Sequence, residues 1–147
     1  MNFSKHIKKL KLETIAEKYI PIDQIKCQYN SDRYKYWVKA CGPSLAIKNG
    51  PFWEYLEYKK LEKYIALFRL YGRSDTWVTN NMLKFQRLYE EISLGGFDEK
   101  KGLPIVLNKP VVPNHHNCSY EIWEGHRRLS ICLYLGRKQK VRLCKIV

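Results

Sequence analysis

The segment YEIWEGHRRLSICLYLG, residues 120–136, contains an abrupt change of pattern that decides how this part of the chain folds. Side chains alternate in character over 120–123, which predicts a strand. The stretch 126–136 then spaces its leucines and Cys132 as a helix does, and Gly136 is a typical helix stop. The sequence therefore predicts a strand that turns at Gly125 into a helix.

This corner has the residues of a phosphate site. A helix N-terminus offers backbone N–H groups and a partial positive charge, and Gly125 lets a ligand approach the backbone. Arg127 or Arg128 can donate charge-assisted hydrogen bonds to phosphate oxygens. We expect His126 to act as a neutral donor or to bind a proton at mildly acid pH. Glu124 is a candidate proton acceptor, helix cap or water-mediated metal ligand. An alternative is that the arginines only pair with nearby glutamates.

Elsewhere, the helical signals lie in the middle of the chain and the strand signals at its ends. The stretch 50–72 is predicted to be a helix that starts at Pro51 and stops at Gly72. The stretch 73–96 is the clearest helix, with Ser74 or Asp75 as its cap and Gly95-Gly96 as its end. Strands are expected at 103–107 and 140–147, the latter within the sheet.

Two segments give weaker signals. In residues 1–19 the apolar side chains recur at helical spacing as far as Ile15 and Tyr19, so short helical turns are expected there, followed by a short strand and a turn within 19–30. The stretch 31–50 interleaves aromatic and basic residues, which favours half-buried sheet residues; a surface that stacks nucleic-acid bases is the alternative.

The fold class that follows is α+β, with a small mixed sheet, helices and an enlarged helical middle. We expect a single domain over 1–147, with a basic N-terminal extension at 1–18 and an aromatic, helical middle at 31–87. The 147 residues carry 27 Lys and Arg against 14 Asp and Glu, a net charge of +13. Such a surface attracts polyanions, so nucleic acid or a nucleotide is the expected partner, although solubility or a basic partner-binding face would also account for it.

Other compositional features point to a reducing, cytoplasmic environment. The five cysteines are odd in number and show no C-x-x-C pair, and neither a signal peptide nor a membrane span of about 20 apolar residues is evident. We therefore expect no membrane association. His115, His116 and Cys118 are of metal-binding types but lack a second cluster, so a loop and no metal site are expected there. No Walker-type phosphate loop or G-x-S-x-G motif is present.

Three stretches resemble the ParB/sulfiredoxin superfamily: IPIDQI at 20–25, PIVL at 104–107 after SLGGFD, and the corner segment with its continuation to 147. The resemblance covers roughly 19–30 and 88–147, and the corner is its most specific part. Compared with the family core, the resemblance makes residues 31–87 an aromatic and helical insertion. It implies a ParB/sulfiredoxin-like fold that binds nucleotide phosphates at Gly125, His126, Arg127 and Arg128.

Members of that superfamily differ in activity. Partition proteins bind and hydrolyse CTP and clamp DNA, some relatives are nucleases, sulfiredoxins use ATP to repair an oxidised cysteine, and free-serine kinases phosphorylate serine. The sulfiredoxin cysteine is missing between Gly125 and His126, so the resemblance does not extend to the repair chemistry. Partition proteins have Glu at the position of His126 and continue into a helix-turn-helix domain, which we do not expect after Val147.

The resulting hypothesis is a DNA-associated nucleotide- or phosphate-binding protein, either a nuclease or a nucleotide-dependent DNA binder. Glu124 and His126 are the candidate catalytic residues, and Asp23, Asn30 and Arg33 are candidate auxiliary residues. ATP or CTP is the implied nucleotide, and a role for magnesium is left open. The alternatives are a small-molecule kinase of the free-serine-kinase type, using ATP or ADP, and a non-catalytic basic binding module. The sequence does not determine the oligomeric state.

Overall fold

The computed structural model describes residues 11–27, 31–96, 99–111, 114 and 117–147. Within them, five strands form one mixed sheet in the order β1-β5-β3-β4-β2. The strands are β1 (Leu12–Tyr19), β2 (Ile25–Lys26), β3 (Ile105–Leu107), β4 (Tyr120–Glu124) and β5 (Lys140–Ile146). The pairs β1/β5 and β3/β4 are antiparallel, whereas β3/β5 and β2/β4 are parallel. The expected α+β class and mixed sheet are confirmed.

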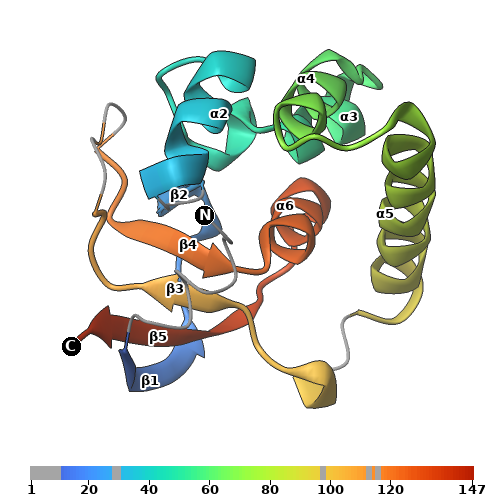
Figure 1. The fold of residues 1–147 in the computed structure, drawn as a ribbon. Coiled ribbons are helices and arrows are strands. Elements are labelled where there is room, and N and C mark those ends of the chain that lie inside the picture. Colours follow the sequence, from blue (N-terminus) through green and yellow to red (C-terminus); the bar gives the residue numbers. More distant parts are fainter. Residues whose placement is uncertain (1–10, 28–30, 97–98, 112–113, 115–116) are drawn as a thin grey trace.

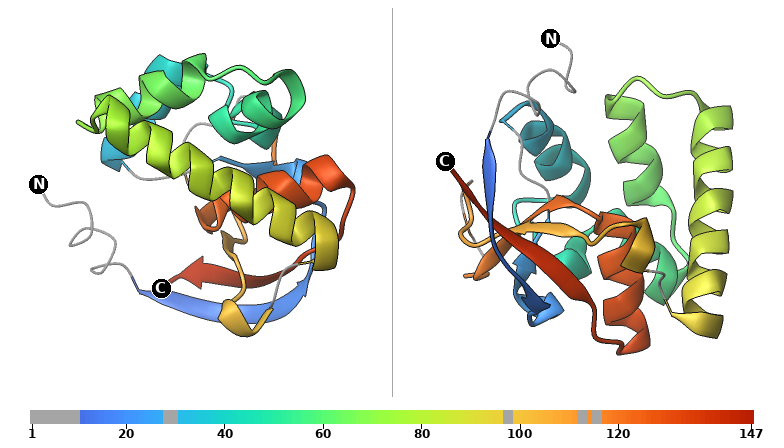
Figure 2. Two further views of the ribbon diagram at one scale, coloured as in Figure 1. Left: turned by 90° about the vertical axis from the view of Figure 1, so that its right-hand side faces the viewer. Right: turned by 90° about the horizontal axis from the view of Figure 1, so that it is seen from below.

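The helices between the strands cover one side of this sheet (Figure 1). They are α2 (Ser31–Cys41), α3 (Pro51–Tyr58), α4 (Glu62–Leu70), α5 (Asp75–Gly95) and α6 (His126–Leu135). Short 3-10 turns are η1 (Ile22–Gln24), η2 (Ile47–Asn49) and η3 (Glu99–Lys101). Helix α6 lies between the sheet and α5, as the views of Figures 1 and 2 agree.

One continuous core joins the sheet to the helices. Ile25, Val106 and Ile122 from the strands and Leu129 from α6 are fully buried together with Phe85 from α5. Burial of apolar side chains of this size stabilises a fold by roughly 1.5–3 kcal/mol each. The core thus fixes the position of α6, and with it the corner that precedes this helix.

The strongest sequence signals are confirmed. Ser74 caps α5, since its hydroxyl oxygen accepts a hydrogen bond of 3.2 Å from the Trp77 N–H, and the helix ends at Gly95. Strands occur within 103–107, 120–124 and 140–147, and β5 lies inside the sheet between β1 and β3. The strand–turn–helix unit at Gly125 is present as predicted.

The expectation of helical turns up to Tyr19 is wrong for the described part of that segment. Residues 12–19 form β1, which pairs with β5 from Leu12 to Tyr19 apart from a bulge between Thr14 and Ala16. Ile15 and Tyr19, which suggested a helical stripe, are 48% and 56% exposed, so they are not the core face of a helix. Residues 12–18, assigned to a basic extension, are part of the sheet. Residues 1–10 lie outside the described residues.

The other two differences concern the helical middle. The sheet residues favoured for 31–50 are instead helix α2 over 31–41, because Trp37 and Cys41, at i and i+4, are both buried. The single helix expected over 50–72 is two helices, since Lys59 has a left-handed backbone (φ 56°) after α3. Its predicted start at Pro51 is confirmed.

Candidate phosphate site at the start of helix α6

The corner between β4 and α6 requires a glycine. Gly125 has φ 109° and ψ 29°, a backbone region that side chains rarely occupy. A Cβ at this position would lie 2.8 Å from Cβ of Pro104, which directly precedes β3. The Leu129 N–H donates to the Gly125 carbonyl oxygen at 3.0 Å and begins the hydrogen-bond ladder of α6. The close packing on Pro104 therefore sets the angle at which the helix leaves the sheet.

The two arginines after this turn point in different directions, because consecutive helix residues lie about 100° apart around the axis. Arg127 faces the helical layer. Its Nη2 donates to Oδ1 of Asn81 on α5 at 2.6 Å, and the guanidinium lies 5.0 Å from the ring centroid of Phe52 on α3. The Tyr64 hydroxyl donates to the same Asn81 oxygen. Arg127 thus joins α6 to three neighbouring helices.

Arg128 points toward the loop before β3. Its Nη1 donates to the carbonyl oxygen of Gly102 at 2.6 Å. Burial lowers the pKa of the Arg128 guanidinium, while Cys132, Glu124 and Glu99 act against this shift. Arg127 is thus held by Asn81 and the Phe52 ring, whereas Arg128 is held by the Gly102 carbonyl and interacts with the charges of Glu124 and Glu99.

A pocket of about 360 Å³ lies beside Gly125. Its walls come from the loop before β3, the corner, α6 and β5. They comprise Lys101, Gly102, Leu103, Pro104, Ile105, Glu124, Gly125, Arg128 and Arg142. Three of these side chains are cationic and one, Glu124, is a carboxylate. Arg142 also approaches Glu17 of β1 at 3.7 Å, in a pair that is half exposed. The lining suits an anion.

His126 lies on the other side of the corner, against the helical layer. Its ring stacks on Trp37 of α2, with centroids 5.1 Å apart and an interplanar angle of 24°. Desolvation, followed by the charges of Arg127 and Arg33, lowers the pKa of His126 to about 3. The imidazole is therefore neutral through the mildly acid range, and of its two predicted roles only that of a neutral donor agrees with this environment.

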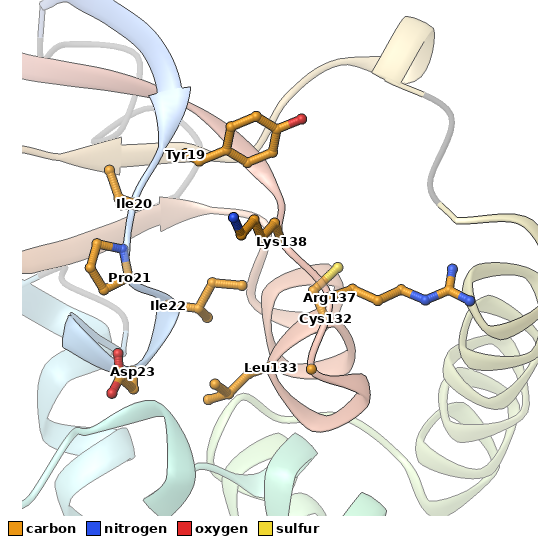
Figure 3. A pocket seen from close by; sticks show the side chains of 10 residues that line it. Tyr19, Ile20, Pro21, Ile22, Asp23, Cys132, Leu133, Arg137 and Lys138 are labelled. Atoms are coloured by element: carbon orange, nitrogen blue, oxygen red, sulfur yellow. The ribbon is translucent and has the colours of Figure 1, made fainter.

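The three auxiliary candidates are placed differently. Arg33 on α2 lies near His126, whose pKa it helps to lower, and its guanidinium is 4.4 Å from the ring centroid of Tyr71. Asp23, in η1, lines a separate pocket with the C-terminal end of α6 (Figure 3). Asn30 lies outside the described residues. The structure therefore brings only Arg33 to the corner, on the His126 side.

Sequence inspection missed Arg142 and Lys101, which line the pocket with Arg128. One signal could have found the region: residues 125–147 contain seven basic residues and no acidic one. The basic residues are Arg127, Arg128, Arg137, Lys138, Lys140, Arg142 and Lys145. Which of them converge on one pocket depends on the pairing of β5 with β3, where Ile105 lies opposite Arg142.

The pocket is a poor match for magnesium. Mg²⁺ is bound through oxygen ligands, chiefly carboxylates and phosphates. Glu124 is the carboxylate among the lining residues, and it is surrounded by three cationic side chains. Over the described residues no group of three or more His, Cys, Asp and Glu side chains is placed to hold a metal ion. His115 and His116 are outside those residues, and Cys118 is buried.

This chain matches no protein-family model, and no curated protein or solved structure shows significant similarity to it. The relation to the ParB/sulfiredoxin superfamily therefore stays a hypothesis based on the sequence motifs. In the part of the chain that the structure covers, none of the helices combines the length and the apolar character needed to cross a bilayer.

Proposed function

We propose that this protein binds phosphate groups of a nucleic acid, or of a nucleotide, in the pocket beside Gly125. The observation that carries the proposal is the convergence of Lys101, Arg128 and Arg142 on a pocket at the start of a helix, with Glu124 as its carboxylate. Two guanidinium groups and an ammonium next to a helix N-terminus favour an oxyanion through both charge and hydrogen bonding.

The two corner arginines have different roles in this proposal, because their side chains lie in different surroundings. Arg128 is held along the pocket wall by its hydrogen bond to Gly102, so the ligand meets a side chain that is already ordered. Arg127 is directed toward Asn81 and the ring of Phe52, away from the pocket lining. We therefore assign phosphate binding to Arg128 and an anchoring role to Arg127.

Nucleic acid is the favoured ligand because of charge. The net charge of +13 would attract a polyanion from a distance, and Lys101 and Arg142 are both exposed at the pocket. A nuclease activity would be the catalytic form of this proposal. In it, Glu124 would accept a proton from the attacking water beside a bound phosphate, and His126 could contribute only as a neutral donor.

The test measures binding of short fluorescent single- and double-stranded DNA by anisotropy between about 50 and 200 mM salt. Arg128→Ala should weaken binding about tenfold or more and reduce the slope of log K against log salt by about 1. Arg87→Ala is the matched control, because Arg87 is exposed on α5, outside the pocket. Equal losses in the two variants would show that only net charge matters and would overturn the assignment.

A second measurement separates DNA from free nucleotides. The melting temperature is recorded with ATP, ADP, CTP and GTP, with and without magnesium. A rise that disappears in Arg128→Ala, without DNA binding, would favour the nucleotide-dependent alternatives, including a kinase. If DNA binds, Glu124→Gln should abolish any cleavage but retain binding. No response to either ligand class would refute the proposed function.

A further inference from the structure

A second and larger pocket lies at the other end of α6, and the proposed function does not use it. Its volume is about 670 Å³, within the range of roughly 300–1,000 Å³ that is typical of small-molecule sites. The residues that line it come from the end of β1, from η1 and from the end of α6 (Figure 3). They are Tyr19, Ile20, Pro21, Ile22, Asp23, Cys132, Leu133, Gly136, Arg137 and Lys138.

Apolar side chains form the middle of this pocket. Ile20 and Ile22 are each 7% exposed and Cys132 is 2% exposed, so the walls are fixed by the core behind them. Leu133 completes the apolar part from α6. A ligand that rests here gains free energy by covering apolar surface, at roughly 25 cal/mol per Å². The middle of the pocket therefore suits an apolar body.

The charged groups of the pocket lie apart. In the view of Figure 3, Lys138 lies toward Tyr19, whereas Asp23 lies on the opposite side of the pocket. Lys138 is exposed and has no ion pair within the described residues. Lys140, close to Tyr19, adds positive charge at the same end, since its Nζ is 5.8 Å from the ring centroid. One end of the pocket is thus cationic and the other anionic.

Arg137, although it lines the pocket, is hydrogen-bonded to the end of α5. Its Nη1 donates to the carbonyl oxygen of Ile92, and its Nη2 donates to that of Ser93 at 2.7 Å. These carbonyls belong to the last turn of α5, where cations are favoured by the helix dipole. Arg137 consequently holds α6 to α5 and forms a rigid wall. Lys138 is the lining cation that remains exposed for a ligand.

We propose that this pocket binds a small organic anion with an apolar body, its carboxylate or phosphate group placed at Lys138. The apolar body would lie along Ile22 and Leu133, and repulsion by Asp23 would exclude the reverse orientation. The inference is independent of the phosphate site at Gly125, because the two pockets have no lining residue in common.

The test compares octanoate and octyl phosphate with octylamine, which has the same chain and the opposite charge. Binding is followed by isothermal calorimetry and by NMR shifts of the unmodified protein. Both anions should bind saturably at one site, and octylamine should bind at least fivefold more weakly. Equal binding of the three ligands to the unmodified protein, or no saturable binding, would overturn the proposal.

Variants then locate the anionic group. Lys138→Ala should weaken octanoate binding about fivefold, as expected for one partly exposed ion pair. Lys84→Ala, which removes an exposed lysine from α5, should have no effect. Asp23→Asn should leave octanoate binding unchanged or tighten it. Equal effects of the two lysine variants, or weaker binding after Asp23→Asn, would contradict the proposed position of the anion.

Discussion

Replacing Gly125 with alanine is expected to destabilise the protein by about 3 kcal/mol, from two separate causes. The first is the backbone: at φ 109° a residue with a Cβ is strained by about 1–2 kcal/mol. The second is packing, because the new Cβ would be 2.8 Å from Cβ of Pro104 and must retreat by about 0.6 Å to reach ordinary contact distance. Overpacking of this kind adds about 1–2 kcal/mol.

Pro104 cannot retreat at no cost. Its carbonyl oxygen accepts a hydrogen bond of 2.8 Å from the Arg142 N–H, which ties the start of β3 to β5. Differential scanning calorimetry should show a melting temperature lower by about 6–12 °C, at roughly 2–4 °C per kcal/mol for a domain of this size.

Gly136→Ala separates the two causes. Gly136 also has a positive φ of 67°, but a Cβ there would have nothing within 4 Å. This variant should therefore lose about 1 kcal/mol, or roughly 2–4 °C, through backbone strain alone. If both alanine variants lowered the melting temperature equally, the contact with Pro104 would not constrain the corner, and the reasoning would be refuted.

Two further predictions concern ionisable groups that pack against other side chains, His126 on Trp37 and Lys26 beside Glu121. The pKa of His126 is about 3 in the folded state and near 6.5 in the unfolded state. As the pH falls, the unfolded chain therefore binds a proton before the folded protein does. The free energy of unfolding should decrease by about 2 kcal/mol between pH 6.5 and about pH 5. Urea titrations of His126→Gln should lack this part of the pH dependence, and an unchanged profile would count against a neutral imidazole stacked on Trp37. Lys26 and Glu121 are 1% and 0% exposed, with Nζ 3.9 Å from Oε1, so Lys26→Met should cost about 3–5 kcal/mol by leaving a buried charge. Adding Glu121→Gln to that variant should restore part of the loss, and a double-variant loss equal to the sum of the two single losses would show that the pair is not coupled.

The parts of this fold that the sequence predicts are those specified by neighbouring residues. The cap at Ser74 and the glycine stop of α5 are local signals, and so is the change of period at Gly125. Such features depend on interactions within a few residues, and all three appear in the structure where they were expected.

The failures come from interactions between distant segments. Residues 12–19 form a strand because β5 supplies their partners, and nothing within the segment itself indicates β5. Trp37 and Cys41 of α2 are buried because they pack against the core. The sequence alone does not show which aromatic residues of this segment are buried, so the helical spacing of these two residues was not recognised. Tertiary pairing and packing override local pattern in both cases.

The candidate site depends on both local sequence signals and interactions between distant segments. Gly125 and Arg128 were found because the corner is a local motif. The pocket beside them is also lined by Lys101 and Arg142. Lys101 is positioned by the loop before β3, and Arg142 is positioned by the pairing of β5 with β3. The different directions of Arg127 and Arg128 follow from helical geometry, but the identity of their partners, Asn81 and Gly102, required the three-dimensional arrangement.

The antiparallel pair of β1 and β5 has a consequence for how the molecule assembles. These strands are the first and last elements described in the chain, yet the Val147 N–H donates to the Lys11 carbonyl oxygen at 3.0 Å. Linking residue 147 to residue 11 through a two-residue Asn-Gly loop, and opening the chain elsewhere, would turn this pair into a hairpin. The circular permutant would replace the most long-range pairing of the sheet with a local one, and its contact order would fall. Since lower contact order accompanies faster folding, the native connectivity sets a kinetic barrier that rearranging the same strands would reduce.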